Sequence, residues 1–592
     1  MPHKSQFVQV AALDSLKEAK CSVVRANGHT IALFLHQGTV HAVDNRCPHM
    51  GFPLDRGTVR DGILTCHWHH ARFDLVSGGT FDPWADDVRT YPIEVRDGQV
   101  FVDVAAPGNP REHQRERLQV GLERDLSLVT GKAVLILAAD EADAVEPFRE
   151  GLLFGTRYRR GGWRQGLTMH TCFMNMLPYL RPEDRPLALY HGLSAVAGET
   201  FGEAPRFPLR PLPGATQDLA TLKRWFRRFI EVRDDEGAER CIVSAIRAGA
   251  GAPEMAGILF AAATDHRYID IGHPADFTNK AFEALDIAGW QHAEVVLTAL
   301  VRGYAMAERM EESNSWRNPV DLVAILETAF EALGEMDLAP EQGLPPWPVV
   351  QALVPVLHGD DPQAIADALL DVLQSGCSPA QVSGIVSYAA ALRIARFHTS
   401  NEFSDWDTAL HTFTFANTID QGLRRAPSRE LLRGVFDAAM SIYLDRFLNI
   451  PAARLPAAGS NGSPDDASPE ESLRRLHALL DRQQQVNQAA DLVAGYLFAG
   501  GDPQQLLATL GHLLLREDRD FHTVQTVEAA FRQYRQWSNG ENKNEGSSEA
   551  GTHILVAASR YLAAHSPTVR AQGQTYDIAY RLHRGDRIFE GD

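Results

Sequence analysis

The sequence predicts a multidomain protein in which a small all-β domain precedes a large all-α domain, built as a helical repeat or bundle. Over residues 1–104, short alternating runs such as "HTIALFLHQ" are separated by Gly, Asn and Asp turn residues, which favours a small sandwich or barrel. Beyond residue 119, segments such as "VDLVAILETAFEALGEM" place apolar residues near a 3.6-residue period, the pattern of amphipathic helices. A chain of 592 residues is also too long for one hydrophobic core.

Three polar stretches predict the breaks between these parts. The segment "AAPGNPREHQRERLQ" (105–119) contains Pro and few apolar residues, so we predict a linker there and assign residues 120–592 to the α domain. Within that domain, "PAAGSNGSPDDASPEES" (456–472) and "SNGENKNEGSSEAG" (538–551) lack the apolar side chains needed for packing. We expect both to be disordered loops.

Composition limits the classes of function. A formal net charge of −19 disfavours binding to nucleic acid and to anionic membranes, because both are polyanions. No apolar run approaches the roughly twenty residues that cross a bilayer, and the N-terminal residues lack the apolar core of a signal peptide. Six cysteines in so long a chain do not form a disulfide framework. We therefore expect a cytoplasmic protein without a nucleic-acid or membrane partner.

Two short boxes carry the strongest chemical signal. "CPHMG" at 47–51 is followed by "CHWHH" at 66–70, and each box offers one thiolate and one imidazole from a single loop. A Cys2His2 zinc site is one interpretation, but zinc fingers usually group Cys with Cys and His with His. One Cys and one His in each loop suit a two-iron cluster with cysteine on one iron and histidine on the other.

These boxes resemble the two motifs of a Rieske [2Fe–2S] domain, and the resemblance covers about residues 5–104, including "FDLVSGGTFDPWADDVRTYPI". It implies that Cys47 and Cys66 bind one iron and that His49 and His69 bind the other. Rieske proteins of respiratory complexes carry an extra cysteine after each box, whereas Gly51 and Trp68 lie there in this chain. We therefore expect a potential toward the low end of the Rieske range, which spans roughly −150 to +300 mV.

A fused Rieske domain usually donates electrons to a mononuclear iron. Ring-hydroxylating oxygenases hold that iron on an α+β domain with an Asp before a His-x4-His pair, whereas the histidines of "DHRYIDIGHPAD" (265–276) are seven residues apart and the downstream pattern is helical. The alternative is an iron site inside a helical bundle, where His266 and His273 could share one helix face. The candidate ligands for a second metal are His170, His191, His266, His273, His398, His411 and His522.

A faint internal repeat supports some of these candidates. "HGDDPQAIADALLDVL" (358–373) is similar to "AGGDPQQLLATLGHLL" (499–514), and "FHT" follows each, at 397–399 and at 521–523. Stacked repeats could bring such histidines together on an inner surface. Each histidine is also open to a second interpretation, because a histidine on an apolar helix is more often a buried hydrogen-bonding residue than a ligand.

The segments "ALYHGLSAVAGE" and "DHRYIDIGHPADF" also resemble the questin-oxidase-like family, in short stretches across about residues 155–537. That resemblance implies a helical, non-haem-iron oxygenase acting on polyketide-type aromatic compounds, with His191, His266 and His273 as the residues carried over. The basic segment "YRRGGWRQG" (158–166) could receive an acidic substrate, or it could be a solvated surface turn.

We therefore expect an oxidoreductase in which the Rieske cluster passes electrons to the helical domain, with a mononuclear non-haem iron as candidate second cofactor. The candidate substrates are oxygen and a small organic compound. No flavin or nicotinamide motif is recognisable, so a separate reductase or ferredoxin is the expected electron donor. The alternative is a ferredoxin-like module tethered to a metal-free helical scaffold that docks a partner or senses redox state.

Overall fold

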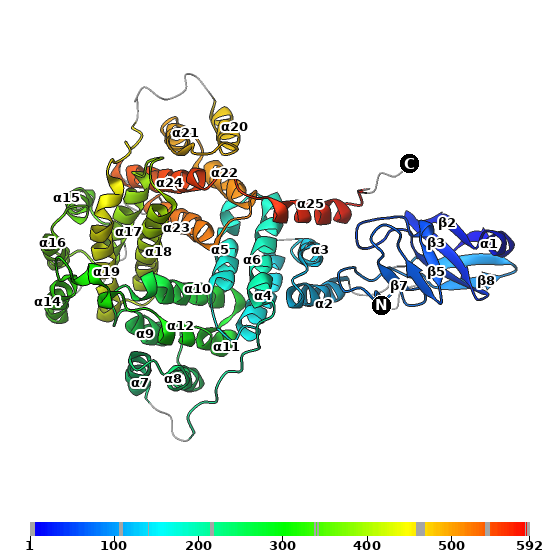
Figure 1. Cartoon of the computed structure of the whole chain (residues 1–592), viewed down its shortest axis with the longest axis horizontal. Coiled ribbons are helices and arrows are strands. Elements are labelled where there is room, and N and C mark those ends of the chain that lie inside the picture. The colour runs from blue at the N-terminus through cyan, green and yellow to red at the C-terminus, as the bar shows by residue number, and fades with distance from the viewer. Residues whose placement is uncertain are drawn as a thin grey trace. The chain divides into compact units, whose positions relative to one another are not determined.

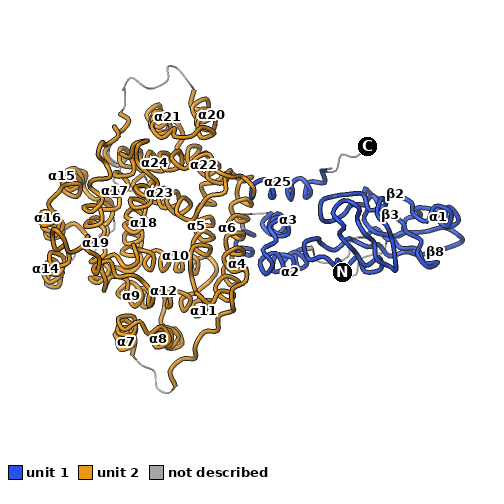
Figure 2. The backbone as a smooth tube through the Cα atoms, viewed as in Figure 1, with its two compact units in different colours: residues 1–147, 572–592 blue, residues 148–571 orange. Residues whose placement is uncertain are grey.

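The computed structural model describes residues 6–105, 110–139, 141–213, 218–336, 339, 343–457, 468–538, 545–586 and 588. The chain divides into two compact units, Met1–Pro147 with Gln572–Asp592 and Phe148–Ala571 (Figures 1 and 2). All β-strands of the described residues lie before residue 104, and the second unit is built from helices. This confirms the predicted fold class, a small all-β domain followed by a large all-α region.

The β part of the first unit consists of three small antiparallel sheets. Their strand orders are β1-β9-β8, β2-β3-β4 and β5-β6-β7. The strands are β1 (Phe7–Ala12), β2 (Cys21–Ala26), β3 (His29–His36), β4 (Thr39–Asp44), β5 (Thr58–Arg60), β6 (Ile63–Thr65), β7 (Arg72–Asp74), β8 (Ile93–Arg96) and β9 (Gln99–Asp103). The first strand pairs with the last, as in Val8 opposite Val102, so the chain ends of this part are held together.

Two apolar cores fill the β part, and β3 is buried on both faces because its successive side chains point alternately into the two cores. One core includes Ile31, Leu33 and Val100. The other includes Leu64 and Phe73 and also contains both cysteines of the two boxes. The loops that carry the boxes are therefore anchored in packed structure.

Four helices complete the first unit: α1 (Leu13–Ala19), α2 (Pro110–Glu123), α3 (Ser127–Leu137) and α25 (Ala571–His583). The segment 105–119 that we predicted as a linker is largely helical, since α2 spans most of it, and residues 106–109 lie outside the described residues. Arg117 of α2 donates hydrogen bonds to the main-chain oxygens of Pro83 (3.0 Å) and Ala85 (2.7 Å). These bonds anchor the helix to the loop before β8.

The second unit is a many-helix bundle in which α5, α10, α18 and α23 pack against one another (Figure 1). None of the described helices is long and apolar enough to cross a membrane. The helices are α4 (Val145–Arg157, which begins in the first unit), α5 (Gln165–Met176), α6 (Arg185–Thr200), α7 (Leu219–Glu231), α8 (Asp235–Arg247), α9 (Ala252–Ala263), α10 (His273–Ala288), α11 (Ala293–Thr298), α12 (Val301–Met306), α13 (Asn314–Arg317), α14 (Leu322–Glu335), α15 (Trp347–Leu357), α16 (Pro362–Gln374), α17 (Pro379–Ala395), α18 (Phe403–Arg425), α19 (Arg429–Leu444), α20 (Pro469–Leu479), α21 (Val486–Phe498), α22 (Pro503–Leu515), α23 (Phe521–Ser538) and α24 (Glu545–Ala564).

The two repeat-like segments both form helices, α16 and α22. Each begins at a Pro whose preceding Asp caps the helix, with Asp361 accepting from the amide of Gln363 (3.0 Å) and Asp502 from that of Gln504 (3.0 Å). Of the two expected disordered loops, residues 458–467 and 539–544 lie outside the described residues. The expected boundaries were too wide, because α20 begins at Pro469 and α24 at Glu545.

A buried ionic cluster joins α10 to α23. The Lys280 ammonium of α10 lies 2.9 Å from a carboxylate oxygen of Glu283 and 2.6 Å from one of Glu528 on α23, and all three side chains are nearly inaccessible. Arg532 adds a second cation 2.8 Å from Glu283. Because buried charges are tolerated only when they are paired, the cluster fixes the position of one helix on the other.

We predict that Lys280→Met destabilises the protein by about 3–5 kcal/mol, because it leaves two buried carboxylates with one cation. Thermal and urea unfolding of the full chain measures this change. The matched control is Lys223→Met, which removes a 2.7 Å ion pair with Glu430 whose side chains are both 27 % exposed. Equal, small effects of the two substitutions would contradict the prediction.

Candidate metal centres

The two Cys–His boxes lie on two loops of the β part. The first loop follows β4 and is closed by the hydrogen bonds from the Cys47 amide to Phe52 O and from the Gly51 amide to Cys47 O, both 2.8 Å. Gly51 has φ +83°, a left-handed conformation that favours glycine. The second loop joins β6 to β7 and is closed by the Cys66 amide, which donates to Ala71 O at 2.8 Å.

The two loops place sulfur inside and imidazole outside. Both cysteines are buried, whereas His69 is exposed and His49 is partly buried. The thiols of Cys47 and Cys66 share a hydrogen bond, which is the main cause that raises the pKa of Cys47 and lowers the pKa of Cys66 to about 6. Backbone amides of the second loop stabilise the Cys66 thiolate further.

The two imidazoles of the boxes face each other. The ring centroids of His49 and His69 are 4.9 Å apart, and Trp84 lies edge-on to His49 at 4.7 Å. His49 Nδ1 is buried and has no hydrogen-bond partner among the described residues, and burial lowers the pKa of this ring to about 4. Two paired sulfurs and two neighbouring imidazoles are the donor set that a two-iron cluster of the Rieske type requires.

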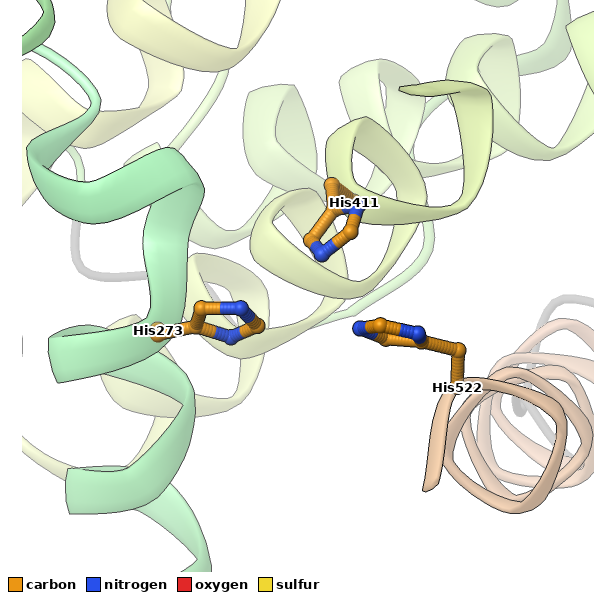
Figure 3. Close-up of side chains that lie close together, drawn as sticks. All are labelled: His273, His411 and His522. Carbon is orange, nitrogen blue, oxygen red and sulfur yellow. The ribbon is translucent and has the colours of Figure 1, made fainter. Parts of the chain in front are cut away.

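A second group of donors lies in the helical unit. His273, His411 and His522 come from α10, α18 and α23, and each has a ligand atom within 4.8 Å of those of the other two (Figure 3). The ring centroid of His411 lies 5.0 Å from that of His273 and 4.7 Å from that of His522. Three nitrogens are buried without a hydrogen-bond partner among the described residues: His273 Nδ1, His411 Nε2 and His522 Nε2.

Asp407 orients two of these rings from one turn earlier on α18. Its main-chain oxygen lies 2.6 Å from His411 Nδ1, which therefore carries the proton and leaves Nε2 as an acceptor. Its carboxylate oxygen lies 3.4 Å from His522 Nδ1. A carboxylate or carbonyl on the outer nitrogen is the arrangement found behind metal-bound histidines.

His273 is positioned by an unusual turn. Tyr268, Asp270 and Ile271 have positive φ angles of 46°, 47° and 48°, and Gly272 at φ +97° packs so closely that an added Cβ would lie 2.9 Å from Phe415. The expectation that His266 and His273 share a helix face is therefore wrong, because this turn interrupts the helix and α10 begins at His273 itself.

Burial favours the neutral form of two rings of this cluster, those of His273 and His411. It lowers the pKa of His273 to about 3, with contributions from His411, His522 and Arg164. The pKa of His411 is lowered for the same main reason. Neutral imidazoles are the form in which histidine binds Zn²⁺, Fe²⁺ and Cu²⁺.

The other four candidate histidines lie outside this cluster and bond elsewhere. A ring nitrogen of His170 lies 2.9 Å from Phe148 O, and one of His191 lies 3.0 Å from Leu515 O. His266 lies between Glu311 (2.6 Å) and Glu231 (3.1 Å). His398 lies in the turn before α18, with Nδ1 3.3 Å from the Thr399 hydroxyl.

A cavity of about 760 Å³ reaches the cluster at His273. Phe277 also lines this cavity and stacks on His273 with ring centroids 5.3 Å apart. The basic segment singled out in the sequence contributes Arg159, Arg160 and Arg164 to the same lining. A small organic molecule would fit a space of this size.

Sequence reasoning missed two residues that these sites use. Asp407 precedes His411 by four residues on α18, a spacing that places two side chains on one helix face. No sequence pattern pointed to Lys132 of α3, because it lies far from the boxes along the chain. Its ammonium lies 2.5 Å from Pro48 O and 2.6 Å from His49 O of the first box.

The β module with paired sulfurs inside and imidazoles at the rim defines a cluster-binding domain of an iron–sulfur protein. Residues 6–92 match the model of the Rieske [2Fe-2S] domain, and the chain belongs to the Rieske family through this domain. Its cofactor is accordingly a Rieske [2Fe–2S] cluster, and the domain is an electron-transfer module.

Several similar proteins match a part of the chain about as long as this domain. The ferredoxin component of an alkene monooxygenase system from Xanthobacter autotrophicus is 31 % identical over 98 residues, which are 16 % of this chain and 80 % of the relative. The ferredoxin component of naphthalene 1,2-dioxygenase/salicylate 5-hydroxylase systems from Ralstonia sp. is 30 % identical over 97 residues, 16 % of this chain and 93 % of the relative. The ferredoxin of carbazole 1,9a-dioxygenase from Nocardioides aromaticivorans, a solved structure, is 28 % identical with a TM-score of 0.16, covering 17 % of this chain and 98 % of that one.

Lys132 places a partly buried positive charge behind the first box. We predict that Lys132→Met lowers the reduction potential of the cluster by on the order of tens of millivolts, because the ammonium favours the reduced, more negative cluster. A redox titration followed by visible or electron paramagnetic resonance (EPR) spectroscopy measures this shift. Lys17→Met, which removes an exposed pair with Asp14, should leave the potential unchanged. A potential unchanged in both variants would show that Lys132 exerts no field on the cluster.

Proposed function

We propose that this protein is a Rieske-dependent non-haem iron oxygenase whose helical unit holds a mononuclear iron on His273, His411 and His522. The observation that carries the proposal is the convergence, within 4.8 Å, of donor atoms from three imidazoles, one buried and two partly buried, beside a cavity of about 760 Å³. In the Rieske domain, Cys47 and Cys66 hold one iron of the cluster and His49 and His69 hold the other.

The Rieske domain favours a redox metal at the histidine cluster. Three histidines with open positions also suit Zn²⁺, but zinc has no redox chemistry and would make no use of an electron. The relatives of the domain are named as ferredoxin components of monooxygenase and dioxygenase systems. Fusion to the oxygenase raises the effective concentration of the donor, and the first electron comes from a separate reductase or ferredoxin.

The residues of the helical unit would have separate roles in such an oxygenase. Iron held by the three histidines would supply oxygen activation. His411 and His522 are held in orientation by Asp407, and Phe277 covers one face of His273 with an apolar ring. Insertion of one oxygen atom consumes O₂, two electrons and two protons and releases water, so two successive one-electron transfers are needed per turnover.

Metal content of the full chain tests this function. Anaerobically purified protein should contain about three irons and two acid-labile sulfides, since a [2Fe–2S] cluster accounts for two irons. His411→Ala should remove one iron and leave the sulfide and the Rieske spectrum unchanged. The control His398→Ala, on a turn residue outside the cluster, should keep about three irons.

Two results would overturn the function. About two irons in both the unmodified chain and His411→Ala would mean an electron-carrying module on a metal-free helical scaffold. Zinc in place of the third iron, in protein expressed with sufficient iron, would rule out a redox role for the three histidines.

Asp407 should tune the affinity of this site. We predict that Asp407→Ala weakens iron binding by about 10–100-fold, because the carboxylate behind His522 is lost. A competition titration with a chelator measures this affinity. Asp286→Ala, which removes an exposed partner of Arg425, serves as the control. Equal affinities of the two variants would contradict the role of Asp407.

A further inference from the structure

The cavity beside His273 carries more positive than negative charge. Four arginines line it (Arg159, Arg160, Arg164 and Arg302) against two carboxylates, those of Glu203 and Asp270. The chain as a whole has a net charge of −19, so a cationic cavity runs against its overall composition. Arginines concentrated in one hollow favour binding of an anion.

Three of these arginines are available to a ligand. The side chains of Arg160, Arg164 and Arg302 are solvent-exposed and make no hydrogen bond or ion pair within the described part of the chain. Arg159, in contrast, donates to Gly162 O at 3.2 Å and lies 4.0 Å from Glu199. Most arginines elsewhere in this unit make a hydrogen bond or an ion pair within the protein. Arg227, for example, donates to the Asp265 carboxylate at 2.7 Å. A guanidinium without a protein partner presents five donors to a carboxylate or phosphate.

Part of the remaining wall of the cavity is apolar. It includes Trp163, Pro274, Phe277, Leu300 and Met306. Phe277 stacks on His273, so the apolar wall adjoins the histidine cluster. A ligand with a charged end and an apolar body therefore meets suitable groups at both ends.

The turn that joins these two walls is strained. Asp270 and Ile271 both line the cavity and both have positive φ angles, and a positive φ is a rare outlier for a β-branched residue such as Ile271. The Asp270 amide donates to Glu308 O at 2.7 Å, which helps to hold the turn. Strain of this kind persists where the surrounding structure fixes it and is concentrated at ligand sites.

We infer that the cavity binds an organic anion, with the carboxylate or similar anionic group on Arg164 and Arg302 and the apolar body against Phe277 and His273. The assignment of this anion as the substrate rests on the proposed oxygenase function. The binding itself depends only on the arginines and the apolar wall, and it can therefore be tested without turnover.

Binding of a matched pair of probes tests the inference. We expect 2-naphthoate to bind the full-length protein at least about tenfold more tightly than the uncharged isostere 2-naphthamide, measured by isothermal titration calorimetry. Arg164→Gln and Arg302→Gln should each weaken naphthoate binding by about tenfold, the effect of losing one charge-assisted hydrogen bond. Neither should change naphthamide binding or iron content. The control Arg474→Gln, on an exposed arginine of α20, should leave the affinity for both probes unchanged.

The outcomes separate this inference from the proposed function. Equal binding of the two probes, or naphthoate binding that is unchanged in Arg164→Gln and Arg302→Gln, would overturn the anion site even if the third iron is present. Selective naphthoate binding that both substitutions weaken would support the site even if the third iron is absent, and the proposed oxygenase would then fail alone.

A second experiment tests whether the bound probe lies close to the histidine cluster. With Mn²⁺ in the histidine cluster, the ¹⁹F signal of 6-fluoro-2-naphthoate should broaden, and His411→Ala should abolish the broadening while the probe still binds. Broadening that is equally strong in His411→Ala would mean that the anion does not lie beside the cluster.

Discussion

Three buried imidazole nitrogens that face one another without a protein partner are the constraint on which the helical unit depends. A buried acceptor left unsatisfied costs about 1–3 kcal/mol, and three lone pairs pointed at one place also repel one another. His273, His411 and His522 are nevertheless held there by three different helices. A cation between them would satisfy all three nitrogens at once, which is the reason for proposing a metal there.

The surrounding structure fixes each of the three helices. Lys280 pairs carboxylates of α10 and α23 in the bundle interior, and Asp407 of α18 contacts two of the three rings. The strained turn before His273 then sets where α10 begins. Because α10, α18 and α23 are held by different contacts, no single one of these contacts defines the site.

Local sequence predicted the Rieske boxes and the division into β and α parts, and tertiary packing decided the rest. Cys47 and His49 lie on one short loop, so their spacing alone indicates a shared centre. His273, His411 and His522 are separated by more than a hundred residues each, and no spacing distinguishes them from His170, whose ring bonds to Phe148 O. The repeat-like segments explain why His398 was also a candidate, although it lies in a turn outside the cluster.

In the proposed function, the two units supply complementary parts of one reaction. The Rieske domain carries electrons, and the helical unit provides donors for a metal next to a cavity with a cationic and an apolar wall. Under this proposal, the arginines of the cavity bind the charged group of the substrate and the Rieske domain supplies the electrons. Substitutions can therefore change one of these roles without changing the other.

Anomalous diffraction at the iron edge, from crystals of the anaerobically purified full chain, tests the metal at the three histidines most directly. The structure predicts one peak from the cluster at the Cys–His boxes and a second, separate peak between His273, His411 and His522. Crystals with a fully occupied cluster and no iron peak between these histidines would contradict it.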